Sequence, residues 1–150
     1  MHSLWNEPDR RDLLGRFDRL KPDTRPEWGK MSAQQMLTHM GDSMRMTIGA
    51  VKIELRRTPL RFTPIKQMVI YALPSAPRNL PTAPELKKTQ PGVWTEDLRD
   101  LKELVRRAVI RHHQPASKWP DHPAFGKLSS RAWGVLTYKH LDHHLRQFGV

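Results

Sequence analysis

The sequence predicts an all-helical fold, and three observations lead to this prediction. Apolar residues recur at helical spacing in four long segments, at about residues 8–20, 32–57, 95–113 and 129–148. Residues that favour helix starts stand at the beginning of these segments. Seven of the thirteen prolines fall between Pro59 and Pro91, so the stretch between the second and third segments cannot be one regular element.

The first predicted helix begins at Pro8, because proline is favoured in the first turn of a helix. It covers about three turns and ends before Pro22. Its apolar residues share one face and are Leu13, Leu14, Phe17 and Leu20.

The second predicted helix starts at Ser32, because Gln35 three residues later completes a capping-box pattern. It is expected to run to about Arg57, where Thr58 and Pro59 would stop it. One face combines a histidine with methionines and small residues: Met36, His39, Met40, Ser43, Met46 and Ala50, with Met44 at the flank. Methionines suit either an adaptable ligand pocket or a core, and the core is the favoured interpretation.

Residues 64–73 are apolar and contain no proline after the first position, which favours a short buried helix, with a strand as the alternative. Residues 74–93 include the run P-S-A-P-R-N-L-P-T-A-P-E-L and are expected to form a long excursion over the surface. Loops of this length often act as lids or linkers. Neither flank is long enough for a core of its own, so residues 1–150 are expected to form a single domain.

The third long helix is expected to start at Thr95, because Glu96 and Asp97 then lie at the positive end of the helix dipole. Its apolar stripe comprises Leu98, Leu101, Leu104, Val105, Ala108 and Val109. His112 and His113 come at the far end, where cationic side chains interact favourably with the dipole. That role is favoured over a ligand role.

The last predicted helix is capped by Ser129 or Ser130. Its wheel has a broad apolar sector that includes two histidines: Trp133, Leu136, His140, Leu141, His144, Leu145 and Phe148. The opposite side carries Arg131, Lys139, Asp142 and Arg146. A buried imidazole needs a hydrogen-bonding or metal partner, so His140 and His144 are candidate site residues, whereas His143 lies at the edge, towards water.

Length and composition exclude several classes of protein. There is no run of about 18 apolar residues and no apolar signal-peptide core near Met1, so the chain is expected to be cytoplasmic and not to enter a membrane. It has no cysteine, which excludes disulfides, thiolate metal ligands and a cysteine nucleophile. Histidine and carboxylate remain as metal ligands, and any reacting thiol must come from outside.

The net charge of +11 requires that nucleic acid or an anionic surface be considered as a partner. The lysines and arginines are scattered, however, and lack the interleaved aromatic residues on which bases stack. A solvated basic surface is therefore favoured. A basic nucleic-acid-binding helical module with structural histidines is kept as the alternative.

His140 and His144 stand four residues apart on one helical face, so their rings could share a divalent ion. The glutamate of H-E-x-x-H is absent, and that protease mechanism is not supported. In an antiparallel bundle His39 could face this pair, giving three nitrogens and an open position for water, as in catalytic zinc sites. Alternatively each histidine is hydrogen-bonded in the core. The convergence of three histidines favours a metal.

The chain resembles the DinB/YfiT-like superfamily in three motifs: W-G-K-M-S-A-Q-Q-M-L-T-H-M, P-T-A-P-E-L and H-P-A-F-G-K-L-S-S-R-A-W-G-V-L-T-Y-K-H-L-D-H-H-L-R-Q-F. The similarity extends over most of the chain from Trp28 onward and is closest to an uncharacterised branch with an H-P-x-F-G lead-in. It implies a four-helix bundle with up-down-down-up topology and a long crossover. It also implies a divalent metal ion, commonly zinc or nickel, bound by His39, His140 and His144.

Members of this superfamily resemble metal-dependent hydrolases, and several are S-transferases or isomerases that use low-molecular-weight thiols such as bacillithiol, mycothiol or glutathione. The resemblance thus implies an enzyme that activates water or a thiol for a small-molecule substrate. A homodimer and a metal-binding scaffold without catalysis are further alternatives.

Four other residues are weaker candidates for proton transfer or for support of the ligands, and catalytic roles are assigned among them only to His143 and His122. The other two are Asp42 and Gln147. Solvent exposure is an equal alternative for His143 and Asp42. His122 could instead simply fix the loop before the last helix.

Overall fold

The computed structural model describes residues 1–73, 75, 86, 89–114 and 118–150. Within these residues it contains helices and no strand, which confirms the all-helical prediction. The elements are α1 Glu7–Arg19, α2 Ala33–Thr47, η1 Pro59–Arg61, α3 Ile65–Gln67, η2 Met68–Ala72, α4 Trp94–His113 and α5 Ser130–Gln147.

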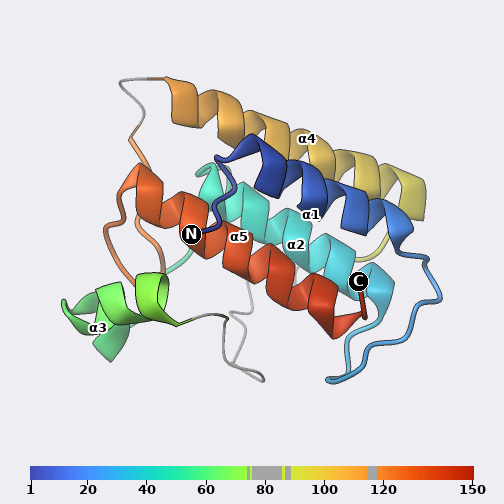
Figure 1. Ribbon diagram of the computed structural model, residues 1–150, viewed down its shortest axis with the longest axis horizontal. Helices are drawn as coiled ribbons and strands as arrows, with labels where there is room; N and C mark the ends of the chain where they lie inside the picture. Colours follow the sequence, from blue (N-terminus) through green and yellow to red (C-terminus); the bar gives the residue numbers. More distant parts are fainter. Residues whose placement is uncertain (74, 76–85, 87–88, 115–117) are drawn as a thin grey trace.

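The four long helices lie side by side as a bundle (Figure 1). α2 packs against α4 and α5, and α1 packs against α5. Figure 1 shows that α1 and α5 run in one direction and that α2 and α4 run in the other. The two helices that carry the candidate ligands, α2 and α5, are therefore antiparallel neighbours.

The main core contains apolar side chains from all four long helices. Its fully buried members include Leu13, Phe17, Met36, Met40, Met44, Leu101, Leu141 and Leu145. Burying such a side chain contributes about 1.5–3 kcal/mol relative to leaving it exposed, and this packing holds α2 and α5 together. The core interpretation of the methionines is confirmed for these three, whereas Met46 packs with Trp133 in a separate cluster.

The starts of three long helices follow local capping chemistry. Asn6 caps α1, and Pro8 lies in its first turn. Ser32 and Gln35 form the predicted reciprocal capping box of α2. Ser129 is the residue that caps α5.

The predicted end of the second helix at about Arg57 is wrong. α2 ends at Thr47, and Gly49 follows with a φ of +75°. Glycine adopts this left-handed conformation without steric cost, which terminates the helix. The N–H groups of Gly49 and Ala50 bond back to carbonyl groups in the last turn. A glycine thus stops the helix well before Pro59 does.

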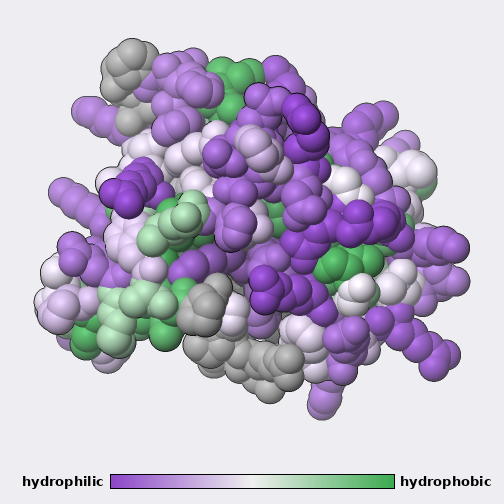
Figure 2. Space-filling model, in the orientation of Figure 1, coloured by the Kyte–Doolittle hydropathy of each residue, from purple (hydrophilic) through white to green (hydrophobic). Residues whose placement is uncertain are grey.

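The short helix predicted over residues 64–73 is present as α3 and η2, and η2 is a π-helical turn. Its predicted burial is wrong for most of the segment, because only Ile70 is buried, whereas Ile65 and Met68 are 39% and 53% exposed. Figure 2 shows apolar side chains gathered on the surface over α3. None of the helices in the described ranges is both long enough and apolar enough to span a membrane.

The excursion predicted for residues 74–93 falls mainly outside the described residues. Among those described, Leu86 is buried and Thr89 bonds to Asp42 of α2. α4 begins at Trp94, one residue before the predicted start. At its end, burial and then the neighbouring His113 lower the pKa of His112, which disfavours the cationic form expected there.

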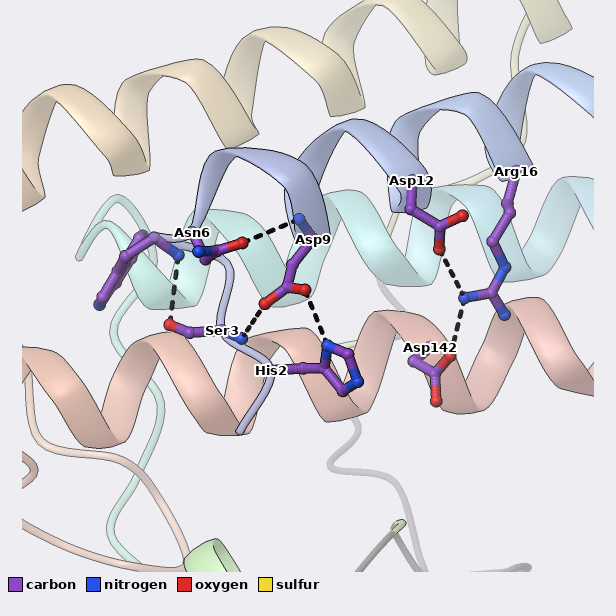
Figure 3. A network of polar contacts seen from close by, with 8 residues as sticks. His2, Ser3, Asn6, Asp9, Asp12, Arg16 and Asp142 are labelled. Carbon is purple, nitrogen blue, oxygen red and sulfur yellow. Dashed lines mark hydrogen bonds and ion pairs between the residues drawn. The ribbon is translucent and has the colours of Figure 1, made fainter.

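Two residues on the polar side of α5 are not fully exposed to solvent. Asp142 is 5% exposed, and its carboxylate accepts a hydrogen bond from Arg16 at 2.7 Å (Figure 3). It also forms an ion pair with Arg146 at 2.9 Å. Lys139 is partly buried and donates from Nζ to the carbonyl oxygen of Ile70 at 2.7 Å. A helical wheel could not show this, because α1 and η2 cover that side of α5.

The N-terminal segment crosses α5 at a glycine. The N–H of Leu4 donates to the carbonyl oxygen of Gly134 at 3.0 Å, and a Cβ atom at position 134 would overlap the indole of Trp5. Glycine is needed there because the backbones approach closely. Asp9 holds the same segment through His2 and Ser3, as Figure 3 shows.

Candidate metal centre

The three histidines predicted as metal ligands meet between α2 and α5. A ring nitrogen of each lies within 4.8 Å of a ring nitrogen of both others. The ring centroid of His39 is 5.2 Å from that of His140 and 5.0 Å from that of His144. Nitrogens bound to a tetrahedral zinc ion at about 2.0–2.1 Å lie roughly 3.4 Å apart. The three side chains are therefore close enough to hold a divalent ion.

The carbonyl oxygen of Leu86 orients His39. It lies 2.7 Å from Nδ1 of the ring. A carbonyl oxygen can only accept a hydrogen bond, so in the neutral ring Nδ1 carries the proton and Nε2 carries the lone pair. Metal-binding histidines use this tautomer when Nε2 binds the metal ion and Nδ1–H donates a hydrogen bond to the protein.

Gln147 orients His144 in the same manner. Its Oε1 lies 2.8 Å from Nδ1 of His144, and its Nε2 donates to the carbonyl oxygen of Trp28 at 2.7 Å. The bond to Trp28 requires the amide NH₂ group, so the amide oxygen must face His144. Nδ1 of His144 is therefore the donor, and the Nε2 atom of this ring also carries a lone pair.

Ser43 supplies the third contact. Its Oγ lies 3.0 Å from Nδ1 of His140. Ser43 stands one turn after His39 on α2. The same face of α2 therefore carries one candidate ligand, His39, and the hydrogen-bonding partner of another, His140. Each of the three rings thus has a protein group at its Nδ1 atom, so a shared ion would be bound through Nε2.

Burial keeps the two histidines of α5 neutral. The pKa of His144 is lowered to about 3, mainly by burial and then by His39. The pKa of His140 lies well below its ordinary value, mainly because of burial and then because of His144. The neutral imidazole is the form that binds a metal ion, so at neutral pH both side chains are in the ligand form.

A cavity of about 910 Å³ lies beside the three histidines and is partly lined by them. Small-molecule sites commonly measure about 300–1,000 Å³, so the cavity can accept a compound of that class. In the described part of the chain, no carboxylate and no fourth histidine joins the group. Three protein ligands leave a coordination position for water or substrate, as in catalytic rather than structural zinc sites.

A family model described as "Protein of unknown function (DUF1569)" matches residues 8–149, a region that includes all three histidines. The chain belongs to the DUF1569 family. No curated protein and no solved structure matches it. The family is uncharacterised, so membership brings no activity with it, and it does not show a link to the DinB/YfiT-like superfamily.

His122 of this DUF1569 chain lines the cavity. Its Nδ1 accepts hydrogen bonds from the backbone N–H groups of Ala124 at 3.1 Å and Phe125 at 3.3 Å. The proton of the neutral ring is therefore on Nε2. Burial lowers the pKa of His122 to about 4, which makes the side chain a neutral donor at neutral pH and a weak base. His122 thus fixes its loop and also contributes to the cavity wall.

His143 also lines the cavity, and its ring meets that of Trp28 edge-on, with 6.0 Å between the centroids. Asp42 is buried, which excludes the solvent-exposed alternative. Its carboxylate accepts hydrogen bonds from the backbone N–H of Thr89 at 3.1 Å and from the hydroxyl group at 2.5 Å. Asp42 thereby holds Thr89 against α2. Thr89 lies three residues after Leu86, whose carbonyl group orients His39.

Ser43 and Leu86 contact the site although neither is predicted from the sequence to have a role there. The helical wheel places Ser43 on the face of His39, and that shared face is a signal for its contact with the site. Leu86 acts through its backbone carbonyl group, for which no side-chain pattern exists. The wheel places Lys139 opposite the apolar sector and gives no signal that this residue lines the cavity.

Proposed function

We propose that His39, His140 and His144 bind one divalent metal ion, zinc or nickel, and that the chain is a metal-dependent enzyme. The reaction class is hydrolysis or S-transfer with a low-molecular-weight thiol. The observation that carries the proposal is the binding of all three Nδ1 atoms by protein groups. A ring nitrogen of each histidine lies within 4.8 Å of a ring nitrogen of both others, and a shared cation would stabilise three nitrogens held this close together.

A catalytic role is supported by the cavity beside a group of only three described ligands. A bound ion would lower the pKa of a water molecule or bind a thiolate. The protein groups have separate tasks. Leu86 and Gln147 hold the rings of His39 and His144 in one tautomer, Ser43 contacts Nδ1 of His140, and the Nε2–H of His122 would donate to a bound molecule.

The resemblance of the three motifs to the DinB/YfiT-like superfamily supports the same proposal, because the positions matched to its ligands are these histidines. We extend the proposal to a distant relationship between the DUF1569 chain and that superfamily. The size of the cavity supports a small-molecule substrate rather than a macromolecule.

Metal content is the direct test. Protein purified without chelators should contain about one zinc or nickel ion per chain by elemental analysis. His140→Ala and His144→Ala should each lose most of it. His113→Ala is the matched control, because His113 lies at the end of α4, outside the site, and should leave the content unchanged. Equal metal content in all four proteins would reject the site and favour structural histidines.

A second experiment separates an enzyme from a metal-binding scaffold. The metal-loaded protein is assayed against panels of ester and amide substrates, and then for conjugation of electrophiles with bacillithiol, mycothiol or glutathione. Turnover that is lost in His144→Ala and kept in His113→Ala is expected. Full metal occupancy without turnover in either panel would favour the non-catalytic scaffold.

A further inference from the structure

The wall of the cavity has an uneven charge. The chain contains fifteen acidic residues, yet no Asp or Glu is among the described residues that line the cavity. Three cationic residues do line it: Lys30, Arg56 and Lys139. Cationic residues are common in this basic chain, so the absence of carboxylates is the more informative observation. Electrostatic attraction in such a cavity favours an anionic occupant over a neutral or cationic one.

Lys139 is the cation best placed to act as an anchor. It comes directly before His140 on α5, and its Nζ donates to the carbonyl oxygens of Ile70 and Leu73. These two bonds fix the ammonium group at the junction of α5 and η2. An ammonium group has three N–H donors, so one donor is left for a ligand in the cavity. The charge is partly desolvated there, which strengthens its attraction for an anion.

A second donor is provided by His122. Its Nδ1 accepts from two backbone N–H groups, so its Nε2–H is the group that can bind a ligand. A neutral donor and a fixed ammonium group on the wall of one cavity match the acceptor oxygens of a carboxylate or a phosphate.

The rest of the wall is largely apolar. Its aromatic and aliphatic members include Trp28, Met46, Leu60, Val69, Phe125 and Leu136. Apolar surface of this kind binds the body of a ligand, while a few polar groups fix its orientation.

We propose that the cavity binds a small organic anion with an apolar body, whose anionic group is held by Lys139 and His122. This inference rests on the proposed function, since it names the substrate class of the same site. A carboxylate and a phosphate monoester share the required chemistry. Lys139 and the three histidines line the same cavity, so the anionic group and the candidate metal centre would share one site.

The test uses the full chain and three probes of one shape: 4-phenylbutyrate, 4-phenylbutanamide and 4-phenylbutylamine. Binding is measured by calorimetry in metal-free protein, so that direct coordination of the carboxylate cannot contribute. The carboxylate is expected to bind at least about tenfold more tightly than the amide, and the amine most weakly. Phenyl phosphate is added as a fourth probe, and its affinity relative to the carboxylate identifies the preferred anion.

Lys139→Gln keeps a hydrogen-bond donor for the carbonyl groups of η2 and removes the charge. It should reduce the preference for the carboxylate over the amide to less than about threefold while leaving the affinity for the amide nearly unchanged. Lys127→Gln is the matched control, because Lys127 is exposed and outside the cavity wall, and it should preserve the preference. Equal binding of acid and amide by the unmodified protein, or a preference kept in Lys139→Gln, would overturn the inference.

The outcome is independent of the metal test. Metal binding without a preference for anions would leave the proposed function intact and remove the substrate class. A preference for anions, in a chain whose purified form and histidine variants show no specific metal content, would support the anion site and reject the metal centre.

Discussion

Gln147 lies between His144 and the loop before α2, with its Oε1 2.8 Å from Nδ1 of the histidine. The side-chain NH₂ group of Gln147 donates to the carbonyl oxygen of Trp28. The backbone carbonyl oxygen of Gln147 accepts a hydrogen bond from the N–H of Glu27 at 2.7 Å. The orientation of a candidate ligand on α5 therefore depends on a loop more than a hundred residues away in the sequence.

Replacing Gln147 by alanine should lower zinc affinity by about 10–100-fold, because the ring of His144 loses the group that fixes its tautomer. Affinity is measured by competition with a chromophoric chelator. Gln67→Ala, at an exposed position of α3, is the control and should bind zinc like the unmodified protein. Unchanged affinity in Gln147→Ala would show that the hydrogen bond has no part in the site.

Gly29→Ala should weaken zinc binding without altering any ligand or its direct partner. Gly29 has a φ of +83°, and a Cβ atom there would lie 2.6 Å from Nε2 of Gln147. The methyl group would displace the amide from Trp28 and so release His144, and we expect at least about a fivefold loss of affinity by the same competition assay.

Gly15→Ala is the matched control for that substitution. Gly15 lies inside α1, and a Cβ atom there would have no other side chain or neighbouring segment within 4 Å. Alanine should therefore raise the free energy of unfolding by about 0.5–1 kcal/mol and leave zinc binding unchanged. A Gly29→Ala protein that binds zinc normally would separate the loop from the site.

The helices and the three candidate ligands could be predicted because each depends on local pattern. The spacing of His140 and His144 places both on one face whatever surrounds the helix, and the Ser32 cap fixes where the helix of His39 begins. The predicted end of α2 is wrong for a local reason as well: Pro59 is the stronger helix breaker, but Gly49 comes first, and a left-handed glycine is a common helix end.

The features that the sequence pattern does not predict arise from contacts between distant segments. Asp142 and Lys139 look exposed on a single helical wheel, but α1 brings Arg16 to one and η2 brings carbonyl groups to the other. The partner of His39 is a backbone carbonyl group 47 residues away, for which the sequence holds no signal. Pattern therefore identifies the candidate ligands, whereas the groups that orient them require the fold.

His122 should make the stability of the metal-free protein depend on pH. Its folded-state pKa of about 4 is below the ordinary value of 6.5, so between these values the unfolded chain binds more protons. The stability that the neutral His122 contributes is fully present above about pH 6.5 and is lost as the pH falls towards 4. From pH 7 to pH 5, His122 should account for a loss of up to about 2 kcal/mol in the free energy of unfolding.

Urea unfolding at both pH values tests this. His122→Gln should lose less stability than the unmodified protein over the same interval, by about that amount. The buried histidines of α5 contribute equally to both proteins, so the difference isolates His122. Parallel losses in the two proteins would show that His122 is not held neutral by burial.

Asp142→Asn should destabilise the bundle without disturbing the metal centre. The side chains of Asp142 and Arg16 are 7% and 11% exposed, and breaking a buried ion pair costs about 3–5 kcal/mol. Arg16 also donates to the carbonyl oxygen of Val150 at 2.8 Å and keeps this hydrogen bond in the variant. We therefore expect the free energy of unfolding, measured with urea, to fall by about 3 kcal/mol.

Zinc content should stay unchanged in Asp142→Asn, because Asp142 contacts α1 whereas His140 and His144 meet His39 of α2. Asp12→Asn is the matched control. Asp12 lies on the other side of the same arginine (Figure 3), but it is 60% exposed and its carboxylate is 3.5 Å from Arg16, so its removal should cost less than about 1 kcal/mol. Equal destabilisation by the two substitutions would mean that burial of the pair does not decide its contribution. Loss of zinc from Asp142→Asn alone would mean that the two faces of α5 are coupled.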